Sequence, residues 1–223
     1  MTNSTTFPGT VTATSYEGSG ANLTGISAGF DPDVDIIKIG NGAGTTTQGA
    51  NAIAIGHDAG SSGTQGEKAV AIGYQAGQAT QGDYSVAVGQ GAGSNAQGNS
   101  AVAIGKSAGQ ISQETQSVAV GLYACYNAQG ASAVAIGIQA GYNAQGASTT
   151  AIGHQAGYNA QGGNCTAIGK EAGRNAQGGG ATAVGREAGK TSQGAQAVAV
   201  GYTAGSSEQG VQAVAMGYQA GQT

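Results

Sequence analysis

A glycine that closes an apolar tripeptide recurs along this chain at a fixed interval. It stands at Gly40, Gly56, Gly73, Gly89, Gly105, Gly121, Gly137, Gly153, Gly169, Gly185, Gly201 and Gly217, and every interval is 16 residues except one of 17. Numbered from the residue after this glycine, the unit reads x-x-Ala-Gly-x-x-x-Gln-Gly-x-x-Ala-Val-Ala-Ile-Gly. Eleven full units run from Asn41 to Gly217. A fixed period of this kind indicates a repeat architecture in which each unit is one structural module.

The apolar end of the unit has the two-residue period of a β-strand. Positions 13 and 15 carry Val or Ile, as at Val102 and Ile104, and position 14 is alanine. Glycines at positions 4, 9 and 16 mark bends and exclude a helix. The pattern predicts an all-β parallel β-solenoid of about eleven 16-residue coils over residues 37–223. We expect residues 1–36 to form a short extended connector, and the extra residue of the 17-residue unit to fall within residues 61–64.

The strand alternation also predicts which side chains face inward. We expect positions 13 and 15 to point into the coil, including Thr150, Thr166 and Thr182, whose hydroxyls would need buried partners. Such a core is thin, so a second buried surface is expected. The opposite face carries only alanine, which predicts close packing against a symmetry mate. These alanines are Ala87, Ala103, Ala119, Ala135, Ala151, Ala167, Ala183 and Ala199. Alternatively, both faces are internal to one flat, two-layered coil.

Composition excludes several classes of protein. The net charge is only −4 and 8% of residues are charged, so no nucleic-acid partner is expected. The 44 glycines do not recur at every third position, which excludes collagen. The sequence shows neither a secretory signal nor an apolar stretch of membrane-spanning length. Cys125 and Cys165 occupy different positions of the unit, which argues against a disulfide.

The strand-glycine pattern resembles the head repeats of trimeric autotransporter adhesins. It is carried by residues 101–105 (Ala-Val-Ala-Ile-Gly), the same sequence at 133–137, and the x-x-Ala-Gly that follows, over residues 37–223. The resemblance implies a left-handed parallel β-roll whose three chains associate side by side. The chain departs from the family in its longer unit with a recurrent Gln-Gly. This sequence also shows no pattern typical of the family's stalk or membrane anchor.

Residues 9–25 are similar to short connector stretches of bacteriophage and large-virus fibre proteins. They alternate Val11, Ala13 and Ser15 against threonines before a glycine-rich turn. Together with the missing signal sequence, this similarity favours a viral fibre over a bacterial adhesin. The chain stops within a unit, which predicts that its C-terminal end touches another protein or marks a truncation.

Three groups of polar side chains are candidates for special roles. Glutamine fills position 8 and predicts a hydrogen-bonded amide ladder, with members Gln81, Gln97, Gln113, Gln129, Gln145, Gln161, Gln177 and Gln193. Tyrosine at position 5, followed by asparagine, is either an aromatic ladder or a receptor contact that stacks on sugar rings; these residues are Tyr126, Asn127, Tyr142, Asn143, Tyr158 and Asn159. A basic cluster beside two glutamates is either a salt-bridge lattice or a site for acidic glycans; it comprises Lys170, Arg174, Arg186 and Lys190.

No arrangement of nucleophile, base or metal ligands stands out in the sequence. We therefore expect a protein that is not an enzyme and needs no cofactor or metal. The leading hypothesis is a homotrimeric structural fibre segment on the surface of a virion, which attaches to a host glycan or receptor and contacts other fibre proteins at its ends. A bacterial cell-surface adhesin head is the alternative. An ice-binding solenoid is a further one, disfavoured because no regular threonine array is present.

Overall fold

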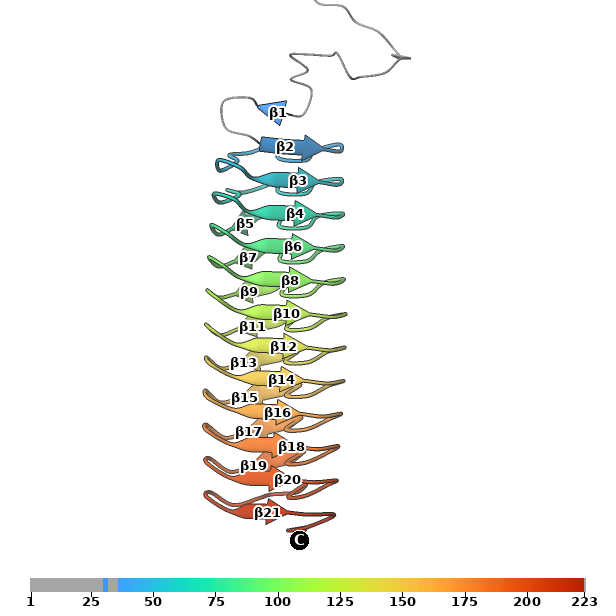
Figure 1. Cartoon of the computed structure of the whole chain (residues 1–223), viewed down its shortest axis with the longest axis vertical. Helices are drawn as coiled ribbons and strands as arrows, with labels where there is room; N and C mark the ends of the chain where they lie inside the picture. The colour runs from blue at the N-terminus through green and yellow to red at the C-terminus, as the bar shows by residue number, and fades with distance from the viewer. Residues whose placement is uncertain (1–29, 32–35, 223) are drawn as a thin grey trace, which may run out of the picture.

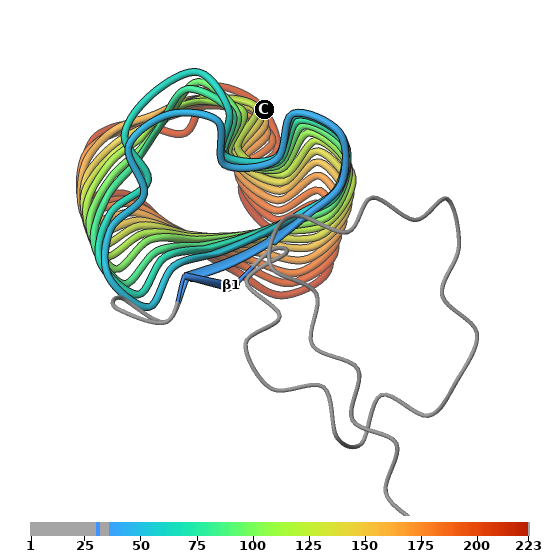
Figure 2. The ribbon, with the colours of Figure 1, turned by 90° about the horizontal axis from the view of Figure 1, so that it is seen from above.

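The chain folds into one stack of parallel β-coils. This computed structural model describes residues 30–31 and 36–222, and in it each repeat makes one turn about a common axis (Figures 1 and 2). The described residues contain strands and turns but no helix. The predicted fold class is confirmed, because the chain is an all-β parallel β-solenoid of about eleven coils, 16 residues apart. Left-handedness, which the resemblance implies, stays a prediction.

The larger sheet contains 13 strands and runs the length of the stack. Its parallel strands pair in strict register, so that Ala103 of one coil lies opposite Ala119 of the next. The strands are β1 (Phe30–Asp31), β2 (Ile36–Ile39), β3 (Ile53–Ile55), β4 (Val70–Ile72), β6 (Val86–Val88), β8 (Val102–Ile104), β10 (Val118–Val120), β12 (Val134–Ile136), β14 (Thr150–Ile152), β16 (Thr166–Ile168), β18 (Thr182–Val184), β20 (Val198–Val200) and β21 (Val214–Met216).

The smaller sheet contains eight strands and forms another side of each coil. It comprises β5 (Thr80–Gln81), β7 (Ala96–Gln97), β9 (Ile111–Gln113), β11 (Asn127–Gln129), β13 (Asn143–Gln145), β15 (Asn159–Gln161), β17 (Asn175–Gln177) and β19 (Thr191–Gln193). Isolated bridges join Gln48 to Gln65 and Gln65 to Gln81. The register therefore survives the 17-residue unit, because its extra residue lies before Gln65, within the predicted residues 61–64.

The first coil has a partner that the repeat pattern does not predict. Strand β1 pairs antiparallel with β2, with Phe30 opposite Ile37, and covers the outer edge of the large sheet (Figure 1). An uncovered edge would offer unpaired backbone groups to another chain. Part of the predicted connector thus belongs to the folded stack, which begins its parallel ladder at β2. The connector-like residues 9–25 lie outside the described residues.

The inward and outward faces of the large sheet are the reverse of the prediction. The position-14 alanines are 0% exposed in the single chain, from Ala54 through Ala199, and form the core with the position-3 alanines. Position 15 faces outward instead: Ile104 is 40% exposed and Ile136 39%. The threonines at position 13 are likewise only half-buried. The expectation that the position-14 alanines form a subunit interface is wrong, because no surface of theirs remains for another chain to cover.

The reason for this reversal is the length of the glutamine side chain. Gln97 reaches from the small sheet across the coil interior, where its Nε2 donates to Val86 O in the large sheet at 2.9 Å. The same bond recurs at Gln113 to Val102 O and at Gln193 to Thr182 O. An interior already crossed by an amide leaves room for a methyl group but not for isoleucine. Small residues therefore face inward and the branched ones face outward.

The glycine at position 16 lets the coils stack closely at the end of each large-sheet strand. Gly121 has φ +130°, a conformation that L side chains rarely adopt, and a Cβ there would lie 2.5 Å from Gly137 O. The same contact recurs at each later coil as far as Gly201. This steric requirement explains why the glycine that defines the repeat is never replaced.

Candidate receptor-contact surface

The predicted glutamine ladder runs through the interior of the stack. Each Nε2 donates to the Oε1 of the next coil, as from Gln81 to Gln97 at 3.0 Å and from Gln177 to Gln193 at 3.0 Å. The chain of bonds is continuous from Gln81 to Gln209. These side chains are at least 93% buried. They hold neighbouring coils together and lie out of reach of a receptor.

The outward face of the large sheet is a continuous apolar stripe. Positions 13 and 15 line it with Val, Ile and Thr, and Leu122 and Ile138 at position 1 extend it with exposed fractions of 39% and 49%. An exposed apolar surface that follows the whole length of a rod marks an interaction site. This stripe therefore replaces the alanine face as the candidate subunit interface.

The tyrosines at position 5 form an aromatic ladder. Tyr142 stacks on Tyr126 with ring centroids 5.2 Å apart and on Tyr158 at 5.0 Å, with interplanar angles of 8° in both cases. Tyr123 meets the first two rings edge-on, and the guanidinium of Arg174 lies over Tyr158 at 5.6 Å. Burial, together with the neighbouring tyrosines, raises the pKa of Tyr142. Because both faces of Tyr142 and of Tyr158 are covered, those rings cannot stack on sugars.

The asparagines beside this ladder are bonded to one another. Asn127 Nδ2 donates to Asn143 Oδ1 at 2.8 Å, and the pattern continues through Asn159 to Asn175. A single N–H of each amide is used in this way, so further hydrogen bonds to a ligand are possible at the edge. The main role of the row is to join coils, as with the glutamines.

We call the six residues Lys170, Glu171, Arg174, Arg186, Glu187 and Lys190 the charged network. Lys190 Nζ lies 2.9 Å from Glu171 Oε2 and 3.0 Å from Glu187 Oε2, and so bridges two coils. Lys170, Arg174 and Arg186 contact the same two carboxylates at 3.8, 3.7 and 3.1 Å. Hydrogen bonds from Lys190 lower the pKa of both glutamates, and hydrogen bonds to them raise the pKa of Lys190. The sequence-predicted cluster is thus brought together as one lattice.

A second tyrosine pair was missed in the sequence. Tyr202 stacks on Tyr218 with centroids 5.3 Å apart, and the guanidinium of Arg186 lies over Tyr202 at 5.4 Å. Both tyrosines stand at position 1 of consecutive units, so the common position was the signal that could have found them. The charged network therefore lies between two aromatic ladders, each ending on an arginine.

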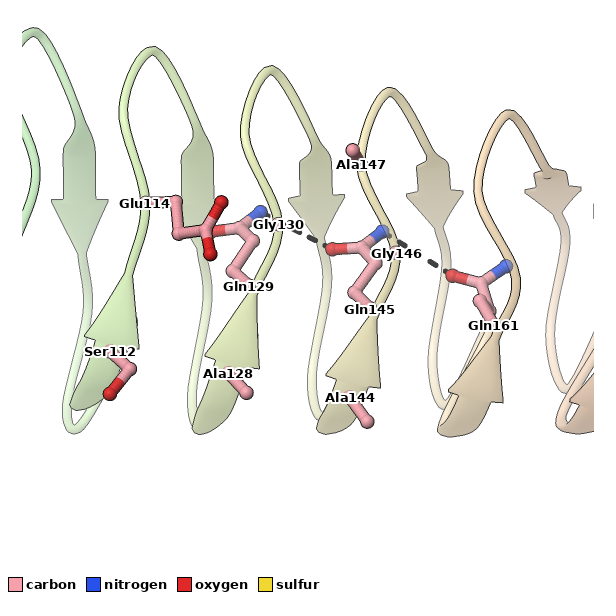
Figure 3. Close-up of a pocket in the computed structure, with 10 residues that line it drawn as sticks. All are labelled: Ser112, Glu114, Ala128, Gln129, Gly130, Ala144, Gln145, Gly146, Ala147 and Gln161. Atoms are coloured by element: carbon pink, nitrogen blue, oxygen red, sulfur yellow. Dashed lines mark hydrogen bonds between the residues drawn. The ribbon is translucent and has the colours of Figure 1, made fainter.

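A shallow groove runs along the small sheet. One stretch has a volume of about 490 Å³ (Figure 3), and a second stretch on the following coils has about 310 Å³. Small side chains such as Ala128, Ala144 and Ala147 line it, together with the backbone of the Gln-Gly corner. At one end the Glu114 carboxylate accepts a bond from Ala131 N at 3.1 Å. The groove offers shape but few converging polar groups, so it specifies no ligand by itself.

The two cysteines are buried and free, which agrees with the argument from their positions against a disulfide. Among residues 30–31 and 36–222, no three His, Cys, Asp or Glu side chains are placed to hold a metal ion. The same residues contain no helix of the length and apolarity needed to span a membrane.

Comparison with known proteins bears on the repeats themselves. The family model of the YadA head domain repeat matches residues 39–59, 48–76, 65–92, 81–108 and 192–220. No curated protein and no solved structure matches the chain. The coils between the matched regions keep the same ladders in the same register. The matched coils are therefore similar to the head repeats of trimeric autotransporter adhesins, and the coils between them continue the same stack.

Proposed function

We propose that this solenoid is the adhesive segment of an extracellular appendage, that it works as a homotrimer, and that it acts by contact alone, without catalysis or a cofactor. The observation that carries the proposal is the match of YadA head domain repeats near both ends of one unbroken stack. Rigid stacked coils hold side chains at a constant spacing over a long surface, which suits attachment to a repetitive target.

The trimer is supported by the apolar stripe. Isoleucines at position 15, such as Ile72, Ile104 and Ile168, expose 36–40% of their surface on one face of the rod. Side-by-side association of three rods would bury these stripes together around a common axis. The charged network and the aromatic ladders that adjoin it lie outside the two strand rows that make up most of the stripe, at positions 1, 2 and 5 of the unit. The charged network supplies the receptor contact.

Adhesion tests the proposal directly. Beads coated with the purified protein are expected to adhere to a panel of bacterial and animal cell surfaces more strongly than beads coated with albumin. Soluble protein added in excess is expected to compete for the same sites. Coated beads that adhere to no surface better than albumin beads would count against the proposed function.

The particle that carries the segment is either a bacterial cell or a virion. The head-repeat match favours the bacterial surface at least as well as a virus appendage. The viral alternative depends on the resemblance of residues 9–25 to fibre connectors. Immunogold labelling of producing cultures separates the two: label on cell surfaces supports the adhesin, and label on released particles supports the fibre.

A further inference from the structure

The charged network carries more positive than negative charge. Its four cations, Lys170, Arg174, Arg186 and Lys190, face two carboxylates, so its formal charge is 4 − 2 = +2 in a chain of net charge −4. The salt bridges within the network therefore leave two positive charges uncompensated, although the protein as a whole is acidic. This excess creates a positive potential on this part of the rod.

Lys190 makes the short contacts with the carboxylates of Glu171 and Glu187, and Arg174 is left with only a long contact to Glu171. The nearest approach of Arg174 is 3.7 Å, from Nη1 to Glu171 Oε2, which is too long for a hydrogen bond. Its Nε is buried and has no hydrogen-bond partner among the described residues. A guanidinium carries five N–H donors. Arg174 therefore presents a positive charge and outer N–H groups with little to satisfy them.

Both arginines are held in place by aromatic rings. Arg174 lies over Tyr158 and Arg186 over Tyr202, at 5.6 and 5.4 Å from the ring centroids. A guanidinium fixed on a ring loses little side-chain entropy when it binds an anion, and its planar fork matches the oxygens of sulfate or carboxylate. The two ladders thus act as supports for the arginines.

The rest of the surface does not favour a neutral sugar. The faces of Tyr142 and Tyr158 are covered, and the asparagine amides bond to one another. The groups with unused binding capacity are cationic and recur on adjacent coils, about 4.8 Å apart. We propose that the charged network binds the sulfate or carboxylate groups of an acidic polysaccharide that lies along the rod. This inference rests on the proposed adhesive function and names its ligand class.

Dextrans with different substituents provide the test. Binding of the full-length protein to immobilised dextran sulfate, carboxymethyl-dextran and unmodified dextran is measured by surface plasmon resonance. We expect binding to one or both charged forms, weakening as salt is raised, and none to unmodified dextran. Retention of dextran sulfate alone assigns the site to sulfate, and retention of carboxymethyl-dextran alone assigns it to carboxylate. Binding to neither, or equal binding to all three, overturns the inference.

Two double variants of equal charge locate the site. Arg174→Gln with Arg186→Gln removes the two ring-supported arginines of the charged network. Lys68→Gln with Lys106→Gln removes two exposed lysines on distant coils, of which Lys68 also lies over a ring, that of Tyr84. The first is expected to weaken binding roughly tenfold or more, since hydrogen bonds to charged groups are lost, and the second to change it little. Equal loss in both variants would show attraction by net charge alone and overturn the site. Circular dichroism and thermal unfolding check that both variants are folded.

The bead assay separates this inference from the proposed function. If the beads adhere but the arginine double variant adheres equally well and binds dextran sulfate like the wild type, the charged network is not the site and the adhesive function stands. If the beads adhere to nothing, the adhesive function fails, and the dextran measurements still report on the anion site.

Discussion

At the scale of single residues, the interior depends on one side chain used in one way. Gln113 accepts from Gln97 at 3.1 Å, donates to Gln129 at 3.2 Å and donates to Val102 O at 2.8 Å. The same amide therefore joins three coils and both sheets. Alanine and glutamine together replace the large apolar side chains that fill ordinary cores, which makes the stack sensitive to polar changes inside it.

Replacing this amide with a carboxyl group should make stability depend on pH. When ionised, the carboxylate of Gln113→Glu can donate neither hydrogen bond and is a buried charge. The pKa of the new carboxyl should therefore lie above its unfolded value of about 4.3. The protonated form keeps one donor, so the penalty is small below that value and grows as pH rises through the folded pKa, reaching about 3 kcal/mol or more. Urea midpoints at pH 4 and pH 8 measure the effect. Gln90→Glu, the same change at an exposed position, is the control. Equal midpoints for both variants at pH 8 would contradict the prediction.

The cysteines should be inert while the protein is folded. Burial raises the pKa of the Cys125 thiol far above its ordinary value and also raises the pKa of Cys165. The thiolate is the reactive form, and neither thiol forms much of it at pH 8. A thiol titration with Ellman's reagent is expected to find no fast-reacting group in the folded protein and two per chain in guanidinium. Rapid labelling of Cys125 in the native state would show that the stack opens locally.

At the scale of strands and turns, the repeat predicted the strands of the large sheet, but neither their orientation nor the strands of the small sheet. Period-two alternation places Val102 and Ile104 on one face and Ala103 on the other, and both orientations satisfy it equally. The orientation depends on what crosses the interior, and the 11-residue reach from Gln97 to Val86 O is a tertiary contact that spacing alone does not reveal. Strand register, coil number and the place of the extra residue follow from the period itself and were predicted correctly.

The turn after each large-sheet strand offers a test of coil stacking. Gly137→Ala would place a Cβ 2.6 Å from Gly153 O at φ +131°, so it combines a clash with backbone strain. We expect it to destabilise the stack by about 3 kcal/mol or to prevent folding. Gly91→Ala is the matched control, because its φ is +64° and the nearest neighbour of a Cβ there, Ser107 Oγ, is 3.6 Å away, so it should cost about 1–2 kcal/mol. Thermal unfolding followed by circular dichroism ranks the two, and equal losses would contradict the clash.

At the scale of the whole molecule, the candidate site was predicted in part. The shared positions of Tyr126, Tyr142 and Tyr158 predicted a ladder, and the basic cluster was found from its spacing. The covering of the ring faces could not be predicted, because it depends on ring tilt at the coil spacing. Nor could the spacing show that Lys190 lies 2.9 Å from the Glu171 carboxylate while Arg174 stays 3.7 Å away from it. These contacts decide which groups remain available to a ligand.

The proposed trimer can be tested on the two opposite faces of the rod. Ile104→Asp with Ile136→Asp places carboxylates in the apolar stripe, where burial between chains would strip them of water, so the trimer should dissociate. Ala128→Asp with Ala144→Asp is the control on the small sheet. Both alanines are exposed and have positive φ, of 43° and 48°, which aspartate tolerates. Sedimentation equilibrium should give a trimer mass for the wild type and the control and a single-chain mass for the isoleucine variant.

A further variant, Ala103→Asp, distinguishes the inward face of the large sheet from its outward face. A carboxylate inside the coil should unfold the chain, whereas one on the outward face should dissociate the trimer. A wild-type monomer, or a trimer that survives the isoleucine changes, would rule out the stripe as the subunit interface.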